Sequence, residues 1–329
     1  MPSQQHPYQT LPIPNDAPFT LKPSGPSKGW GAFATRRISR GTVILRERPL
    51  FAIPKHHTAI TSSDVLSALR TSSPTTQRQF QALRDHHATL PFPNPAKAFA
   101  ENSFAIGTDT HSPAHGFFPL LSRFNHACLP NAAVPLLKDA DAPALYATRD
   151  IAAGEEIAFS YDPRFESRTA RERHASLGFA CGCRACHPPG SRFQRASDLR
   201  RRLIRGLQFM VSGDDDGEER FHVIAEPEVR KQVAECRTPL SVLLVCNLLT
   251  QCLMEAEGIL DDFEIGRLQP GATAMAKMLR RPENARIARF AMAQRTPNER
   301  LRVAFALYGR ADEGDEEMAY TLRHIQGVS

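Results

Sequence analysis

The chain has 329 residues, of which 41% are hydrophobic and 23% charged, a composition that excludes a disordered or fibrous protein and indicates a globular one. The longest apolar run, Val242 to Leu253, is interrupted by Asn247, Thr250 and Gln251, so it predicts a buried helix and excludes a bilayer-spanning segment. The formal charge of +6 favours anionic neighbours.

The residue pattern predicts four regions in chain order. Residues 1–19 are expected to be a flexible tail without a secretory signal, because the first twenty residues contain five prolines and no apolar core segment. Residues 20–162 alternate short strands with turns, apart from a helical insertion at about 52–100. A cysteine-rich segment follows at 163–190, and helical spacing then predicts an all-α region over 191–329.

Helix signals in the second half are specific enough to give boundaries. Asp162-Pro163 supplies an N-cap and a first-turn proline, and Gly178 a C-terminal stop, which together predict one helix of about four turns. Helices are also expected over 196–211, 227–235 and 239–257. The apolar stripes predicted to face the core are Leu199, Leu203 and Leu207, and Leu240, Leu243 and Leu244.

One internal repeat is present. Residues 34–44 and 147–157 both read A-T-R-x-I-x-x-G-x-x-I. In each copy a glycine ends a polar turn and an apolar strand resumes, which predicts two similar β-hairpins that frame the strand-rich domain.

Three short motifs carry polar chemistry within the strand-rich region. In Lys28-Gly29-Trp30-Gly31, two glycines flanking one residue let the backbone approach a ligand closely, although such turns are common. The run from Asn125 to Asn131 places a histidine, a cysteine and two amides around a proline, and a hydrogen-bonded turn with a buried cysteine is the alternative interpretation. Ile157 to Tyr161 alternates as a strand and ends on a tyrosine.

The cysteines predict a metal site. Cys181, Cys183 and Cys186 can wrap one face of a tetrahedral zinc ion, which requires four ligands. His187 is too close to Cys186 to complete the tetrahedron without strain, and Cys128 is the other cysteine that lies in a motif. The remaining cysteines, Cys236, Cys246 and Cys252, lie on apolar helices and are expected to be buried small hydrophobic residues.

In this order the motifs resemble those of SET-domain methyltransferases, and the helical C-terminal half resembles the SMYD-type branch and its fungal relatives. The resemblance covers about residues 20–190. Two departures are present: residues 45–101 contain no cysteine, so the MYND zinc module is missing, and Ala127 stands where the family has a small hydroxyl residue. The resemblance implies an α+β SET fold, with small curved β-sheets around a threaded C-terminal segment.

The resemblance also implies S-adenosylmethionine as cofactor and a lysine side chain of a protein as methyl acceptor. Tyr161 matches the catalytic tyrosine at the methyl-transfer pore, where Phe159 and Phe124 would complete an aromatic channel. The implied zinc is structural, with Cys128, Cys181, Cys183 and Cys186 as its ligands. The residues implied to bind the cofactor are Lys28, Gly29, Trp30, Gly31, Asn102, Asn125, His126, Tyr161 and Phe179.

Two alternative hypotheses stay open. Ala127 is compatible with a SET-fold binding or scaffold protein in chromatin or transcription regulation that has lost turnover. Between Arg164 and Arg205 eleven arginines accompany three acidic residues, which indicates either a solvated helix face or contact with nucleic acid or an acidic partner. For the methyltransferase we expect a histone or non-histone protein substrate, a monomer, no membrane partner, and a nuclear or cytoplasmic location rather than secretion.

Overall fold

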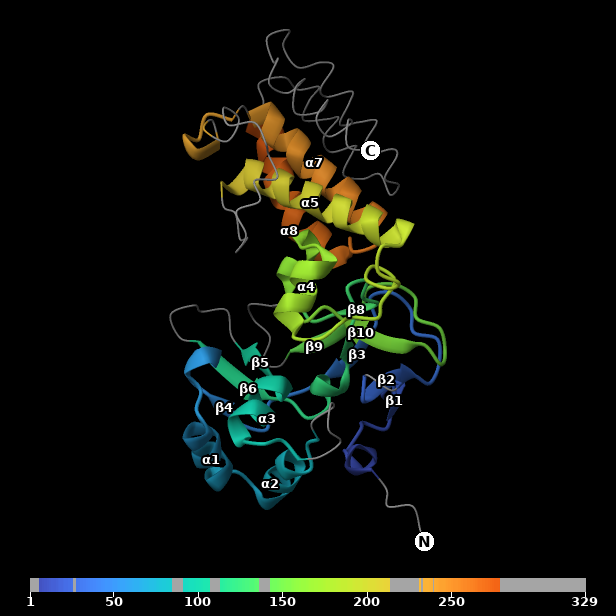
Figure 1. The fold of residues 1–329 in the computed structure, drawn as a ribbon, viewed down its shortest axis with the longest axis vertical. Helices are drawn as coiled ribbons and strands as arrows, with labels where there is room; N and C mark the ends of the chain where they lie inside the picture. Colours follow the sequence, from blue (N-terminus) through green and yellow to red (C-terminus); the bar gives the residue numbers. More distant parts are fainter. Residues whose placement is uncertain are drawn as a thin grey trace. The chain divides into compact units, whose positions relative to one another are not determined.

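The structure is a computed structural model, shown in Figure 1. It describes residues 6–25, 28–84, 91–106, 113–135, 143–213, 231, 233–238 and 240–278. The chain divides into two compact units, Met1–Ser160 and Tyr161–Ser329. Most of the helix expected over 227–235 lies outside the described residues.

Three small sheets form the framework of the first unit (Figure 1). Their strand orders are β1-β2-β10-β7, β3-β9-β8 and β4-β6-β5. β7 runs parallel to β10, and the other neighbouring strands of the described residues pair antiparallel. The strands are β1 (Phe19–Pro23), β2 (Trp30–Ala34), β3 (Val43–Arg46), β4 (Ala52–Ile53), β5 (Ser103–Ile106), β6 (Ala114–Phe117), β7 (Asn125–His126), β8 (Ala132–Ala133), β9 (Ala144–Ala147) and β10 (Glu156–Phe159).

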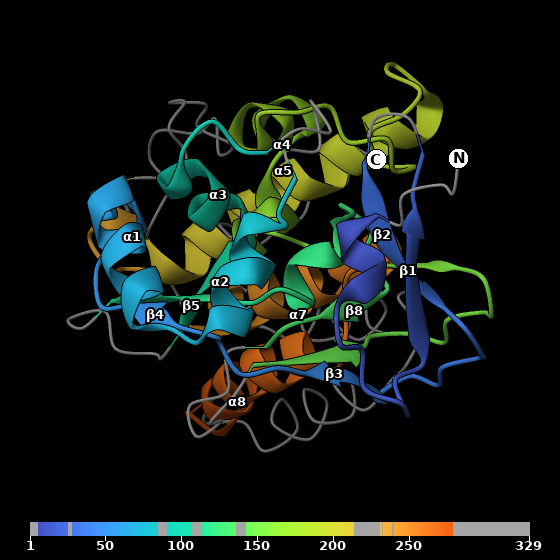
Figure 2. The same cartoon turned by 90° about the horizontal axis from the view of Figure 1, so that it is seen from below.

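Helices occupy the stretch between β4 and β5 where the sequence predicts a helical insertion (Figure 2). These are α1 (Ser62–Thr71), α2 (Pro74–Gln81) and α3 (Pro95–Asn102). Each begins at a side-chain cap, supplied by Thr61, Ser73 and Asn94 respectively. Two short 3₁₀ turns, η2 (His57–Ala59) and η3 (Leu121–Arg123), lie before α1 and before β7.

Phenylalanine rings join this insertion to the sheets. The ring of Phe51, just before β4, lies 5.5 Å from those of Phe99 and Phe117 and 6.0 Å from that of Phe80, measured between centroids. Phe99 and Phe117 are at most 1% exposed. Aromatic side chains of this size contribute much of the apolar area that a small domain buries, so Phe51 anchors the insertion on the core.

The internal repeat does not form the two predicted hairpins. One copy connects β2 to β3 and the other connects β9 to β10, so each crosses between two sheets. The copies pair with each other instead: Ile38 and Ile151 exchange two backbone hydrogen bonds of 2.9 Å. Gly41 donates to the Ala147 carbonyl, and Gly154 donates to the Ala34 carbonyl, each at 2.8 Å.

This reciprocal pairing explains why both copies need the glycine. Gly41 has a φ of +81° and Gly154 a φ of +83°, in the left-handed region that side chains disfavour. Each glycine turns the chain so that its own N–H reaches the other copy. The repeat therefore holds β2 beside β10, and β3 beside β9.

The described part of the predicted tail is packed rather than loose. It contains the 3₁₀ turn η1 (Pro7–Thr10), and Tyr8 is only 4% exposed. The Tyr8 hydroxyl accepts a 2.8 Å hydrogen bond from the Arg84 N–H and donates to the Arg84 carbonyl at 3.2 Å. The His6 ring stacks on Trp30 with centroids 4.3 Å apart. Proline content predicted flexibility here, but the two aromatic rings supply enough contact to fix the segment.

In the second unit, the helix predicted from Asp162 to Gly178 is two elements. A 3₁₀ helix, η4 (Pro163–Ser167), ends at Arg168, and α4 (Ala170–Leu177) begins after it. Thr169 starts α4 with a capping box. Its side chain accepts a hydrogen bond from the Glu172 N–H, and the Glu172 carboxylate accepts one from the Thr169 N–H. The predicted stop is correct, because Gly178 has a φ of +71° at the C-terminus of α4.

The rest of the described second unit consists mainly of long helices: α5 (Arg192–Ser212), α7 (Leu240–Glu257) and α8 (Asp262–Met278). α7 packs against both α5 and α8. The division after Ser160 differs from the boundary expected near residue 190, because the intervening segment bonds to α5. Ala170 N–H donates to Asp198 at 2.7 Å, and Arg201 donates to the Phe165 carbonyl.

The leucine stripe predicted on α5 is partly wrong. Leu207 is buried, but Leu199 and Leu203 are half-buried, and the core face carries Ser197 and Arg201 instead. The cause lies on α7, where Glu257 is 2% exposed and accepts from Ser197 at 2.5 Å and from Arg201 Nε at 3.0 Å. A buried carboxylate needs such donors, so it draws the polar side chains inward.

On α7 itself, Leu244 is fully buried while Leu240 and Leu243 are half-buried. Buried side chains extend around this helix, as expected for one that packs against two neighbours. Among the helices of the described residues, none has the length and hydropathy needed to cross a membrane.

A half-buried carboxylate, Glu47, holds the loop that leads to β7. It accepts the backbone N–H groups of Leu120 at 3.0 Å and Leu121 at 2.7 Å. Burial raises the pKa of Glu47 from 4.5 to about 7, and the two backbone hydrogen bonds and Arg123 oppose that rise. The folded protein therefore takes up a proton more readily at Glu47 than the unfolded chain does.

This difference predicts a pH dependence of stability. The contribution of protonated Glu47 is complete below pH 4.5 and is lost as the pH rises through about 7. Relative to a Glu47→Gln variant, the wild-type free energy of unfolding should fall by roughly 3 kcal/mol over that range. Urea denaturation of both proteins at a series of pH values measures this difference, and equal pH slopes would contradict it.

Candidate functional site

The Gly-x-Gly segment spans the end of the β1–β2 turn and the start of β2. Ser24 N–H donates to the Gly29 carbonyl at 2.8 Å, and the strands pair on either side with Lys22 opposite Gly31. Gly29 has a φ of +65°, which favours glycine. Gly31 is needed for space, since a Cβ there would lie 2.5 Å from Glu156 Oε1 and 2.8 Å from Asn125 Nδ2.

Glu156, at the start of β10, joins three segments that are distant in sequence. Its carboxylate accepts hydrogen bonds from the Ser24 hydroxyl, from Lys28 Nζ at 3.3 Å and from Asn125 Nδ2 at 2.7 Å. Its side chain is 19% exposed. We call Ser24, Lys28, Gly31, Asn125 and Glu156 the turn cluster. It brings together three predicted cofactor-binding residues, Lys28, Gly31 and Asn125.

Sequence reasoning missed Ser24 and Glu156. A signal for Glu156 was present, because Ile157 and Phe159 are buried and a strand alternates its faces. Glu156 and Ala158 therefore share the opposite face, and Ala158 pairs with Asn125 in the parallel ladder. The sequence does not show that β7 pairs with β10. Without that pairing, a glutamate that follows a polar turn does not predict a contact with Asn125.

The run from Asn125 to Asn131 lies beside β10. Asn125 and His126 pair with Ala158 and Phe159, and the Ala127 N–H donates to the Phe159 carbonyl at 3.1 Å. Asn131 is 3% exposed; its Oδ1 accepts the Ala158 N–H at 2.8 Å, and its Nδ2 donates to the Glu156 carbonyl at 2.8 Å. Its side chain thus takes the place of a strand backbone and fixes Asn125 relative to β10.

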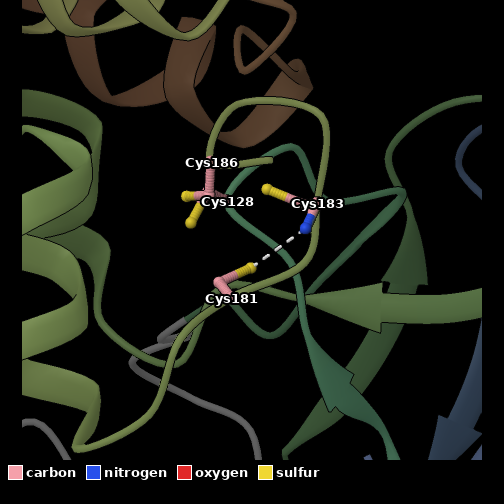
Figure 3. A group of neighbouring side chains, drawn as sticks. All are labelled: Cys128, Cys181, Cys183 and Cys186. Carbon is pink, nitrogen blue, oxygen red and sulfur yellow. Dashed lines mark hydrogen bonds between the residues drawn. The ribbon is translucent and has the colours of Figure 1, made fainter. Parts of the chain in front are cut away.

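The four cysteines predicted to bind a metal lie together (Figure 3). Their sulfur atoms are all within 4.8 Å of one another, and Cys128, Cys181 and Cys186 are buried. Tetrahedral zinc with bonds of about 2.3 Å separates its sulfur ligands by about 3.8 Å, so small movements close the coordination sphere. These four sulfurs could hold a metal ion, and an all-thiolate donor set suits zinc.

Two nitrogen groups approach these sulfurs. His126 is 4% exposed, and its Nε2 lies 3.2 Å from Cys128 Sγ. Arg173, on α4, is fully buried, and its Nη2 donates to Cys186 Sγ at 3.2 Å and to the Ala185 carbonyl at 3.3 Å. Positive charge and N–H donors stabilise thiolates, the form in which cysteine binds a metal.

The other predicted site residues have separate environments. Trp30 begins β2 and stacks with His6. Phe179 is half-buried just after α4, and Tyr161, which directly follows Ser160, is 44% exposed.

The side chain of Asn102 is directed into the first unit. It is 1% exposed, its Nδ2 donates to the Ala98 carbonyl at 2.7 Å, and its Oδ1 accepts from Arg123. A ligand contact through this amide would break those bonds, which disfavours the predicted role for the side chain. The cause is Arg123, a nearly buried cation that requires an acceptor.

The two phenylalanines expected in an aromatic channel are core residues. Phe124 is fully buried, with its ring 5.0 Å from that of Phe19, and Phe159 is 4% exposed, with its ring 5.9 Å from that of Phe104. Phe159 faces the core through strand alternation in β10, and both rings belong to the core cluster of the first unit.

Many arginines between Arg164 and Arg205 have partners within the second unit. Besides buried Arg173, these include Arg164 with Asp162, Arg200 and Arg201 with Glu257, Arg205 with Glu172, and Arg184 over the Phe193 ring. These contacts give much of the basic stretch a structural role and weaken the hypothesis of a continuous nucleic-acid surface.

Comparison with known proteins supplies the family. A family model described as SET domain matches residues 29–162. The chain is 32% identical over 201 residues to histone-lysine N-methyltransferase set5 of Schizosaccharomyces pombe, a match that covers 60% of this chain and 56% of the relative. It is 30% identical over 106 residues to mouse protein-lysine N-methyltransferase SMYD4, covering 31% of this chain and 13% of that protein.

The chain thus spans about half the length of the yeast relative and a small part of the mouse one. The matched residues 29–162 contain β2 to β10, with Gly29, Gly31, Asn125 and Glu156. The SET domain predicted from the motif order is confirmed by this match, and so is the mixed α+β fold of small sheets with helices. Residues 29–162 of this chain form a SET domain.

Proposed function

We propose that this protein transfers a methyl group from S-adenosylmethionine to the side-chain amine of a lysine in a protein substrate. One observation carries the proposal: the turn cluster, of which Gly31, Asn125 and Glu156 lie within the SET domain, joins the Gly-x-Gly backbone to Asn125. The names of the two relatives support lysine methylation, and the name of the yeast relative supports a histone substrate and hence a nuclear location. We include in the proposal that the protein acts as a monomer. We also include the cysteine-rich segment at 163–190 and the all-α region at 191–329 as separate parts of the chain.

The residues present fit the cofactor's polar and nucleoside parts. Gly29 and Gly31 leave backbone groups that a ligand can approach, with Lys28 and Trp30 beside them. Asn125 offers its side-chain oxygen, and the half-buried Phe179 offers an aromatic face for a purine. His126 contributes through the backbone of β7, because its ring is directed at Cys128. When bound, the cofactor supplies a sulfonium-activated methyl group.

The protein's part in the reaction is to prepare and aim the amine. A free lysine has a pKa of about 10.4, so its ammonium must lose a proton and its water shell before it can attack. We assign Tyr161 to the amine: its ring desolvates the nitrogen, and its hydroxyl orients it. Orientation of this kind lowers the barrier by holding the reacting atoms in line.

We also propose that Cys128, Cys181, Cys183 and Cys186 bind one structural zinc ion. The proximity of the four sulfurs supports this, as do Arg173, which donates to Cys186, and the His126 ring nitrogen beside Cys128. Four thiolates leave no open position for water, so the ion would stabilise the fold rather than take part in methyl transfer.

A binding or scaffold role without turnover is the second candidate, and Ala127 favours it. The residue lacks the hydroxyl that the family places there, while its backbone N–H still bonds to Phe159. Such a protein would keep cofactor binding and lose transfer, so binding and transfer must be measured separately.

The proposed cofactor site predicts binding that depends on the space at Gly31. Calorimetry should detect S-adenosylhomocysteine binding to the wild-type chain. Gly31→Ala should weaken it at least tenfold, because the added Cβ collides with Glu156 and Asn125. Gly266→Ala is the matched control, since a Cβ at this exposed position of α8 meets nothing within 4 Å. An absence of binding to the wild type would refute the proposed function.

The proposed zinc site predicts that zinc binding depends equally on Cys128 and on the cysteines of the 181–186 segment. Purified wild-type protein should contain about one zinc per chain by elemental analysis, and Cys128→Ser should lose the metal as fully as Cys183→Ser. Cys246→Ala is the control, because burial raises the pKa of that α7 thiol to about 12 and keeps it neutral. Retention of zinc by Cys128→Ser alone would show that Cys128 is not a ligand.

A further inference from the structure

The side-chain amide of Asn125 has its two ends in different surroundings. Its Nδ2 lies 2.7 Å from Glu156 Oε1 and 3.3 Å from the Trp30 carbonyl oxygen. Within the part of the chain that the structure describes, its Oδ1 accepts no hydrogen bond. The residue is half-buried, so a ligand can still reach it.

These contacts fix which end of the amide faces Glu156. A carboxylate and a backbone carbonyl can only accept hydrogen bonds, whereas the amide nitrogen donates two. Turning the amide over would place Oδ1 against two acceptors and lose both bonds. The orientation is therefore set by the network, with the nitrogen toward Glu156 and Trp30 and the oxygen presented as an acceptor.

Glu156 can impose this orientation because it is itself held in place. Ser24 donates to the same oxygen that Asn125 uses, and Lys28 pairs with the other oxygen at 3.3 Å. The missing side chain at Gly31 lets the carboxylate and the amide meet above the backbone of β2. The contact with Lys28 is an ion pair, so it also holds the carboxylate by charge attraction.

We infer that Glu156 is a positioning residue that locks Asn125 with its Oδ1 outward, where it recognises a hydrogen-bond donor, the ammonium of the cofactor's amino-acid part. This inference rests on the proposed function and deepens it. Glu156 itself acts through Asn125 and does not contact the ligand. Replacement of Glu156 should therefore leave the affinity for a ligand that lacks the amino-acid part unchanged.

Two ligands separate this role from general support of the fold. S-adenosylhomocysteine carries the ammonium, and methylthioadenosine has the same nucleoside and sulfur without the amino acid. In calorimetry, Glu156→Ala should weaken S-adenosylhomocysteine binding about tenfold, the effect of one hydrogen bond to a charged group, and change methylthioadenosine binding less than about twofold. Glu156→Gln keeps an acceptor for Asn125 and should restore most of the lost affinity.

Further variants test the route of the effect. Glu155→Gln is the control, since that neighbouring carboxylate bonds to Arg149 and Asn131 and does not touch Asn125. In an Asn125→Ala background, Glu156→Ala should add less than about a twofold loss, because the two residues act as one unit. If Glu156→Ala does not fold, Glu156→Met fills the same space without an acceptor and should give the same selective loss.

The outcomes separate this inference from the proposed function. Selective loss of S-adenosylhomocysteine affinity that disappears in the Asn125→Ala background supports the inference. Equal weakening of both ligands, or a full further loss in that background, overturns it while cofactor binding stands. A wild-type protein that binds neither ligand overturns both.

Discussion

The carboxylate of Glu156 is the interaction on which the candidate site depends. A carboxylate that is four-fifths covered must find donors, and this one takes them from the β1–β2 turn and from β7. Ser24 and Asn125 are separated from it by 132 and 31 residues. One side chain thus bonds to Ser24 and Lys28 of the turn and orients the Asn125 amide.

The carboxylate can serve both segments only because the backbone places β10 between β2 and β7. The repeated segments achieve that placement by pairing with each other through Ile38 and Ile151 and through two glycine N–H groups. Asn131 then locks β10 to the loop after β7. Backbone pairing thus places the strands, and hydrogen bonds of polar side chains fix the positions of the site residues on them.

The sequence predicted most where the signal was local. Three cysteines in six residues predict a thiolate cluster by their spacing, and Cys128 was predicted because it is the other cysteine in a motif. Of the cysteines excluded as buried helix residues, Cys246 and Cys252 are buried, whereas Cys236 is exposed in a turn. Gly178 marked a helix end because a left-handed C-terminal residue favours glycine. The Gly-x-Gly segment predicted close approach, although the two glycines serve different needs: conformation at Gly29 and space at Gly31.

The sequence predicted least where the partner is distant. Nothing near Arg201 indicates that Glu257, 56 residues later, draws it into the core in place of the half-buried Leu203. Asn102 was assigned to the cofactor by resemblance, but Arg123 occupies its side-chain oxygen. The repeat was visible, yet the turn chemistry that predicts a hairpin also suits a crossing between sheets. In each case a tertiary contact outweighed a local preference.

The central claim is that this SET domain transfers methyl groups and does more than bind the cofactor. Its most direct test is methyl transfer from labelled S-adenosylmethionine to proteins of a cell extract, comparing wild type with Tyr161→Phe. We expect labelled lysine with the wild type and at least a tenfold lower rate with the variant, while both bind S-adenosylhomocysteine alike. Equal labelling would remove Tyr161 from the reaction, and no labelling by a wild type that binds the cofactor would contradict the claim.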